Sequence, residues 1–228
     1  MNFESIGDNF PLYLTGLGVT LKLLVLSLSC GLLLALPLAV VRTVSRGFAS
    51  RAVWAYTYVF RGTPMLVQLF LCYYGLAQFE SVRESVAWPW LSSASFCAWL
   101  TFSLNTAAYT TEIIAGSIRA LPAGEIEAAK ALGMSRGLLL RRVVLPAALR
   151  RALPAYGNEA IFMLHGTSLA SVVTLLDVTG AAREVNAKYY LPFEAFITAG
   201  AFYFVLTLGL VGLFRWAESR WLKPMMSR

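Results

Sequence analysis

Long apolar stretches alternate along this chain with shorter segments that hold most of its charged residues. A helix needs about 20 predominantly apolar residues to cross the hydrocarbon core of a bilayer, and each stretch reaches that length. The pattern therefore predicts an all-α membrane protein, with five transmembrane helices in a single domain that covers residues 1–228. The predicted spans are residues 17–41, 53–78, 96–116, 156–176 and 192–213.

Basic residues gather on one side of this predicted topology. Lys and Arg number three in the connector 42–51, seven in the segment 119–154 and four in the tail 215–228, against three in the remaining loops. Cytoplasmic loops of membrane proteins carry the excess of Lys and Arg, so these segments are expected inside and the N-terminus outside. The net charge of +7 is explained by this distribution, and no nucleic-acid partner is expected.

The segment 119–154, called the basic elbow below, is too polar to cross a bilayer. Helix-favouring residues from Glu127 to Leu132 predict a short helix, and Gly133 permits the left-handed turn that ends it. A second helical run over residues 138–144 is expected to stop at Pro146. A compact pair of helices on the cytoplasmic side indicates a docking element for another protein.

The basic elbow also resembles the EAA loop of ABC-importer permease subunits. That loop has Glu-Ala-Ala, then a glycine after three residues, then Ile-x-Leu-Pro after nine more; here Val143 stands in the place of the isoleucine. In that family the loop is cytoplasmic, and its short coupling helix lies in a cleft of the ATPase subunit. The resemblance implies that the ATPase-docking residues are Glu127, Ala128, Ala129, Gly133, Leu145 and Pro146.

The resemblance extends over nearly the whole chain from the first predicted span onward. The runs 60–69, 105–112 and 145–159 are similar to signatures of polar amino-acid ABC permeases. The runs 163–170 and 214–222 resemble the M-type subunit of histidine/lysine/arginine/ornithine permeases. Many relatives of the glutamine and arginine types carry Lys-Asp where this chain has His165 and Gly166.

This resemblance implies the type I ABC importer permease fold, and one membrane-spanning subunit of an ATP-driven importer for amino acids. Basic amino acids (histidine, arginine, lysine and ornithine) are the expected cargo. The implied partners are a related second permease subunit, an ATP-binding cassette ATPase dimer and an extracytoplasmic amino-acid-binding protein, in the lipid bilayer of the bacterial cytoplasmic (inner) membrane. This multi-pass subunit is then no enzyme and holds no cofactor, because the partner ATPase binds ATP and Mg.

Polar side chains inside the predicted spans are the candidates for the transport path. A charged side chain at the centre of a bilayer costs about 2.5–3.5 kcal/mol on insertion scales, so such residues are usually paired or functional. Arg61 and Glu112 fall at similar depth on neighbouring predicted helices, which predicts a structural ion pair. Groups near the span centres that could hold an amino-acid zwitterion, or simply bond across helices, are Thr63, Asn105, His165, Thr167 and Ser168.

Other functions fit the sequence less well. No Gly-Lys dipeptide occurs, so a phosphate-binding loop and ATP hydrolysis by this chain are not expected. One histidine and three dispersed cysteines do not have metal-ligand spacing, so no metal site is expected. A stand-alone secondary transporter or channel is the main alternative, although such folds usually show an internal repeat, and none is visible here. A structural scaffold would need neither paired charges at depth nor the basic elbow.

Overall fold

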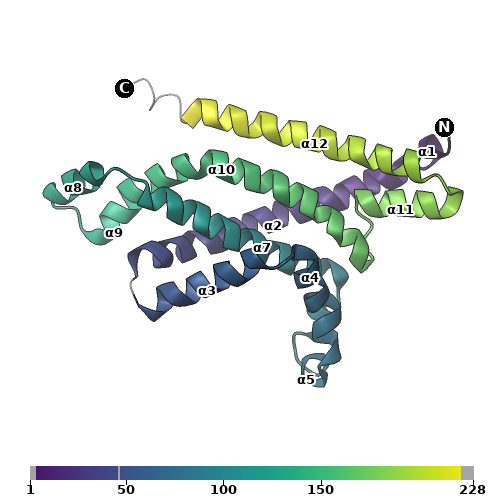
Figure 1. Cartoon of the computed structure of the whole chain (residues 1–228), viewed down its shortest axis with the longest axis horizontal. Helices are drawn as coiled ribbons and strands as arrows, with labels where there is room; N and C mark the ends of the chain where they lie inside the picture. Colours follow the sequence, from purple (N-terminus) through teal and green to yellow (C-terminus); the bar gives the residue numbers. More distant parts are fainter. Residues whose placement is uncertain (1–3, 46, 222–228) are drawn as a thin grey trace.

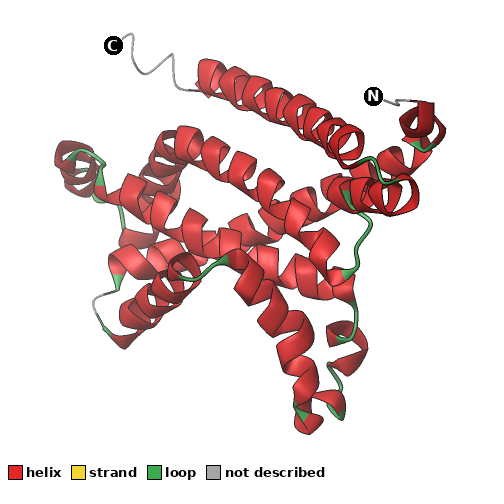
Figure 2. Cartoon of the chain, turned by 45° about the vertical axis from the view of Figure 1, so that its right-hand side comes forward, coloured by secondary structure: helices red, strands yellow, loops and turns green. Residues whose placement is uncertain are grey.

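The computed structural model describes residues 4–45 and 47–221, and within these residues it contains helices and no strand (Figure 2). Three basic residues that count toward the predicted cytoplasmic side, Arg46, Lys223 and Arg228, lie outside the described residues. The long helices run roughly along the long axis of the molecule, with α8 and α9 at one end and α1 and α11 at the other (Figure 1). The all-α prediction is therefore confirmed for the described chain.

Helices α2 (Phe10–Val44), α7 (Ala94–Arg119) and α10 (Leu145–Gly166) form the centre of the molecule. Small side chains let them approach closely: Ala35 and Ala39 of α2 are fully buried, and they pack with Ala115 of α7 and Ala152 of α10. Helix association inside a membrane depends on such close contact, because lipid supplies no hydrophobic driving force between helices. These three helices are the rigid frame on which the remaining elements are placed.

The helix predicted over residues 53–78 is interrupted in the middle. Helix α3 (Phe48–Gly62) ends before Thr63, whose backbone is extended, and α4 (Met65–Phe70) begins after Pro64. Proline lacks an N–H and disfavours helical backbone in the residue before it, which accounts for a break at this point. The segment then continues through a π-helix, Leu71–Gly75, and a 3-10 turn, Leu76–Gln78. The short helices α5 (Glu80–Arg83) and α6 (Trp88–Leu91) follow before α7.

The prediction that the second elbow helix stops at Pro146 is wrong. Helix α8 (Ala123–Ala131) is followed by α9 (Arg136–Leu139) and a π-helical turn (Leu140–Val144), which continues directly into α10. Pro146 occupies the first turn of α10, directly after the π-helical turn, and the chain is helical on both sides of it. Pro154 lies inside the same helix. One helix therefore leads from the basic elbow into the centre of the molecule.

Residues 177–191, predicted as a connector, contain helix α11 (Val178–Tyr189). The Asp177 carboxylate accepts a hydrogen bond of 2.8 Å from the Gly180 amide and so caps the helix start. Its buried face carries Val178, Ala181, Ala182 and Val185, at the spacing of an amphipathic helix. It follows a 3-10 segment (Thr167–Val173) that extends α10.

Two described helices are long and apolar enough to cross a membrane, α2 and α12 (Pro192–Trp221). A third is reached if the bent pair 136–173 and 178–189, with 45° between its parts, is taken as one span. The helix pattern is thus that of a membrane protein. Near the start of the chain, α1 (Glu4–Asp8) precedes α2.

Gly16 of α2 touches the backbone of the turn before α11. A Cβ atom at Gly16 would lie 2.6 Å from the carbonyl oxygen of Asp177, and backbone cannot yield as a flexible side chain can. We expect Gly16→Ala to destabilise the fold by about 1–3 kcal/mol through overpacking. The matched control is Gly18→Ala, where a Cβ meets nothing within 4 Å and helix propensity gains up to about 1 kcal/mol. Thermal unfolding in one detergent measures both variants, and equal melting temperatures would contradict the close contact.

Candidate functional site

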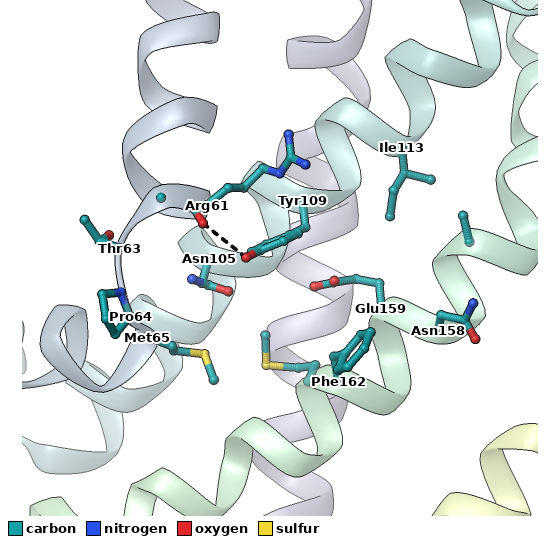
Figure 3. Close-up of a pocket in the computed structure, with 13 residues that line it drawn as sticks. Arg61, Thr63, Pro64, Met65, Asn105, Tyr109, Ile113, Asn158, Glu159 and Phe162 are labelled. Carbon is teal, nitrogen blue, oxygen red and sulfur yellow. Dashed lines mark hydrogen bonds between the residues drawn. The ribbon is translucent and has the colours of Figure 1, made fainter.

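A cavity of about 670 Å³ opens beside the break between α3 and α4. Three elements form its wall: the broken segment, helix α7 and helix α10 (Figure 3). The cavity is therefore bordered by the one place in this region where the backbone leaves helical geometry. Its lining residues are Arg61, Gly62, Thr63, Pro64, Met65, Asn105, Tyr109, Ile113, Ala155, Asn158, Glu159, Phe162 and Met163.

The side chain of Gln68 holds the break in place. Its amide nitrogen donates to the Phe60 carbonyl at 2.8 Å, to the Thr63 carbonyl at 3.1 Å and to the Thr63 hydroxyl at 2.8 Å. Its amide oxygen accepts from Asn105 Nδ2 of α7 at 3.0 Å. Backbone groups freed inside a membrane need such partners, because no water replaces them. Gln68 was missed at the sequence level; its place four residues after Pro64 is the signal that could have found it.

Two charged residues line the cavity, Arg61 from α3 and Glu159 from α10. The Arg61 guanidinium lies 5.3 Å from the centre of the Tyr109 ring, and the Tyr109 hydroxyl donates to the Arg61 carbonyl at 3.3 Å. Glu159 of α10 is only 7% exposed, and its carboxylate extends into the space in front of Asn105 and Tyr109 (Figure 3). A buried carboxylate aimed into a cavity can receive a cationic group of a ligand.

Glu159 had been given no role at the sequence level. The predicted span began at residue 156 and placed Glu159 near a membrane boundary, where a charge needs no explanation. The observed helix begins at Leu145 and carries Glu159 into the centre of the molecule. The same α10 face presents Ala155 and Phe162, at helical spacing from Glu159.

The five predicted substrate-path residues divide into two groups. Thr63 and Asn105 line the cavity, whereas His165, Thr167 and Ser168 do not. His165 Nε2 lies 3.2 Å from the Thr207 hydroxyl of α12. The Thr167 hydroxyl donates to the Leu164 carbonyl at 2.6 Å, and the Ser168 hydroxyl donates to the His165 carbonyl at 2.7 Å. His165 is rotated off the face of α10 that carries Glu159, and Thr167 and Ser168 lie in the 3-10 segment that follows α10.

The predicted ion pair between Arg61 and Glu112 is replaced by another. Glu112 Oε1 accepts from Arg42 Nε at 3.1 Å and from the Thr57 hydroxyl at 2.9 Å, and Arg119 Nη1 lies 4.0 Å from Oε2. Thr57 is one helical turn before Arg61 on α3. The prediction that Arg61 and Glu112 lie at the same depth was therefore wrong by about one helical turn. Arg61 lies at the level of Tyr109, and Glu112 contacts the end of α2 instead.

The basic elbow has a small apolar core of its own. Leu121, Leu139, Val144 and Ala148 are buried in it, together with Ala129 of α8. Gly133 has a φ of 75°, which confirms the predicted left-handed turn. Of the predicted docking residues, Glu127, Ala128 and Gly133 are exposed, Leu145 and Pro146 are half-buried, and Ala129 faces the elbow core.

No group of three or more His, Cys, Asp or Glu side chains that could hold a metal ion occurs among the described residues. The cavity chemistry is thus that of one carboxylate, one guanidinium, amides, hydroxyls and backbone groups. Such groups can bind both ends of a small zwitterion and leave its covalent structure unchanged. This arrangement suits recognition and passage of a polar molecule.

A double-mutant cycle tests the observed ion pair. We expect Arg42→Gln and Glu112→Gln to be coupled by roughly 0.5–3 kcal/mol in the free energy of unfolding, because the two side chains are in contact and half-buried. The cycle of Arg61→Gln with Glu112→Gln is the control and should be additive within about 0.5 kcal/mol. The reverse result, coupling to Arg61 and none to Arg42, would restore the original sequence-based pair.

Comparison with known proteins agrees with this geometry. The family model for "Binding-protein-dependent transport system inner membrane component" matches residues 27–223. The nopaline transport system permease protein of Agrobacterium fabrum is 44% identical over 227 residues, which cover 99% of this chain and 94% of that protein. The histidine/lysine/arginine/ornithine transport system permease protein of Escherichia coli K12 is 47% identical over 210 residues, covering 92% and 88%.

Solved structures give the same result. The crystal structure of an amino acid ABC transporter with histidines matches with a TM-score of 0.86 at 36% identity, covering 96% of this chain and 99% of that one. An inward-facing structure of the MetNI methionine ABC transporter matches with a TM-score of 0.70 at 21% identity, covering 92% and 94%, and shows likeness of fold alone. The chain therefore belongs to the family of inner membrane components of binding-protein-dependent transport systems.

Proposed function

We propose that this chain is a membrane-spanning subunit of an ATP-driven importer that carries amino acids with cationic side chains, and that the cavity beside Pro64 is part of the transport path. The observation that carries the proposal is the buried Glu159 carboxylate, which faces the cavity opposite Arg61. The permease of Escherichia coli that resembles this chain is named for histidine, lysine, arginine and ornithine, which supports the choice of cargo.

In this proposal Glu159 accepts hydrogen bonds from the cationic end of the substrate. Arg61 and the backbone amides and carbonyls around Thr63 serve the α-carboxylate and α-ammonium groups, while Asn105 fixes the break through Gln68. Glu159 on one wall would bind a positive group and Arg61 on the other a negative group. Together they favour a zwitterion whose side chain carries a further positive charge. Tyr109 holds the backbone of Arg61 and shields its guanidinium.

Five membrane crossings with the N-terminus outside remain the proposed topology. The distribution of basic residues supports it, and α3 with α4 and the following turns supplies one broken crossing. Helix α7 carries Asn105, Glu112 and several buried threonines, so it is less apolar than α2. Its polar groups face protein, and a crossing helix surrounded by other helices tolerates them.

The basic elbow is the proposed docking element for the ATPase dimer, which would bind ATP and Mg in place of this chain. A related second permease subunit and an extracytoplasmic amino-acid-binding protein complete the proposed complex. The outer face of α8 presents Glu127 and Ala128, and Leu132 just beyond it is 80% exposed. An exposed leucine at the tip of a cytoplasmic element is suited to a hydrophobic cleft in a partner.

Removal of the Glu159 charge tests the transport path. Glu159→Gln keeps the side-chain shape, and we expect kcat/KM for uptake of arginine or lysine to fall by about tenfold to a hundredfold, since a hydrogen bond to a charged group contributes roughly 1.5–3 kcal/mol. Uptake of a neutral amino acid should fall less. The control is His165→Leu, outside the cavity, which should leave the preference unchanged. A shifted preference in His165→Leu together with none in Glu159→Gln would place the path elsewhere.

A charge at the elbow tip tests docking. We expect Leu132→Asp to weaken binding of the ATPase by about thirtyfold or more, because an unpaired carboxylate placed in an apolar contact costs at least roughly 2 kcal/mol. The matched control is Val86→Asp, an equally exposed apolar residue in the loop between α5 and α6. Titration of ATPase onto the purified permease measures both variants. ATPase affinity that Leu132→Asp leaves unchanged would show that the elbow tip is not in the interface.

A further inference from the structure

Two of the helices that line the cavity, α7 and α10, also enter the basic elbow. Helix α7 contributes Tyr109 and Ile113 to the cavity and then runs through Arg119 into the elbow. Helix α10 begins at Leu145 in the elbow and contributes Ala155 and Glu159 to the cavity. If a partner displaces α8, the displacement can therefore reach the cavity wall along the chain in two ways, through α7 and through α10.

A guanidinium bonds these two routes together between the elbow and the cavity, next to the packing of Ala115 of α7 with Ala152 of α10. Arg151 Nη1 of α10 donates to the carbonyl oxygen of Ala120 at 2.9 Å. Ala120 is the residue that ends α7, and carbonyls at a helix end lack partners within the helix. Arg151 lies one turn before Ala155 on α10, and Ala120 lies about two turns after Ile113 on α7. The contact thus crosses from helix to helix on the elbow side of the cavity.

The same helix end is held from its other side. Arg119 lies 4.0 Å from Glu112, whose carboxylate is fixed by Arg42 of α2 and Thr57 of α3. Leu121, two residues after Arg119, is buried in the elbow core with Ala129 of α8. The turn 119–121 is therefore bonded to α10 and packed against α8, and the ion pair of Arg119 joins it to Glu112 on the same helix, which in turn contacts α2.

We propose that Arg151 is a positioning residue for coupling: it makes α7, α10 and the coupling helix α8 move as one body, so that movement of α8 changes the cavity. The proposal rests on the proposed function, since α8 must be displaced by an ATPase. A guanidinium at a helix end also adds stability as a simple cap. A cap alone predicts lower thermal stability and an unchanged ratio of transport to ATP hydrolysis, whereas a coupling link predicts a lower ratio in an assembled complex.

The test compares neighbouring arginines in the full complex in proteoliposomes. Arg151→Gln removes the contact, whereas Arg150→Gln removes the same charge from a residue that makes no hydrogen bond or ion pair with the part of the chain that the structure describes. We expect the number of substrate molecules imported per ATP hydrolysed to fall by about threefold to tenfold in Arg151→Gln, the range for loss of one link in a coupling network. Arg150→Gln should keep the wild-type ratio.

The conservative variant sharpens the result. Arg151→Lys keeps one donor on a shorter arm, and we expect it to restore part of the lost ratio. An unchanged ratio in Arg151→Gln, or equal losses in Arg151→Gln and Arg150→Gln, would overturn the proposal. Wild-type complexes that show no ATP-driven uptake would instead contradict the proposed function, so the two failures are distinguishable.

A measurement on the unmodified complex decides the question if Arg151→Gln assembles poorly. Hydrogen exchange with and without a non-hydrolysable ATP analogue should change together in peptides that cover 116–121, 123–131 and 148–155, if the three segments move as one body. A change in 123–131 with none in the other two peptides would overturn the proposal.

Discussion

A helix that is interrupted inside a membrane leaves backbone groups that need partners, and the cavity depends on how those groups are satisfied. Pro64 breaks the segment, and Gln68 folds back to bond two carbonyls and the hydroxyl of Thr63. Asn105 then fixes Gln68 from α7. This small network satisfies the irregular backbone at the edge of the cavity with protein partners.

Two acidic side chains near this network, the half-buried Glu112 and the buried Glu159, have different surroundings. Glu112 is surrounded by Arg42, Arg119 and Thr57, so its charge is used to hold helices together. Glu159 faces the cavity, and Arg61 on the other wall is engaged with Tyr109. Arg61 supplies a charge of opposite sign near Glu159, and the position of this carboxylate at the cavity wall supports the proposed contact with a cationic ligand. The difference between the two acids supports a structural role for Glu112 and the proposed ligand-binding role for Glu159.

The sequence predicted best where local chemistry decides the conformation. Gly133 adopts the expected left-handed turn, because few other residues occupy that region without strain. Pro146 misled the prediction because a proline that stops one helix can equally begin the next. Helix α11 was missed because its mixed charges hid the apolar spacing of its buried face, which starts at Val178.

The candidate site was less predictable, because it depends on helix rotation and on where each helix begins. Thr63 and Asn105 were placed in the path by their depth, and both line the cavity. Depth alone could not tell that His165 faces α12, nor that Arg61 falls one turn away from Glu112. Side-chain direction repeats every 3.6 residues, so an error of two or three residues in a boundary or rotation changes which partner a residue meets.

The connection between elbow and cavity bears on the choice between an ATP-driven subunit and a stand-alone channel. A channel needs a path and a gate, but it does not need a basic elbow with its own apolar core. Here that core contains Leu121, just past the end of α7, and Ala148, in the first turns of α10. Since the same two helices form the cavity wall, force applied at the elbow reaches the cavity through packed helices that are hard to compress. This continuity of structure is what an external motor requires, and it favours the ATP-driven subunit.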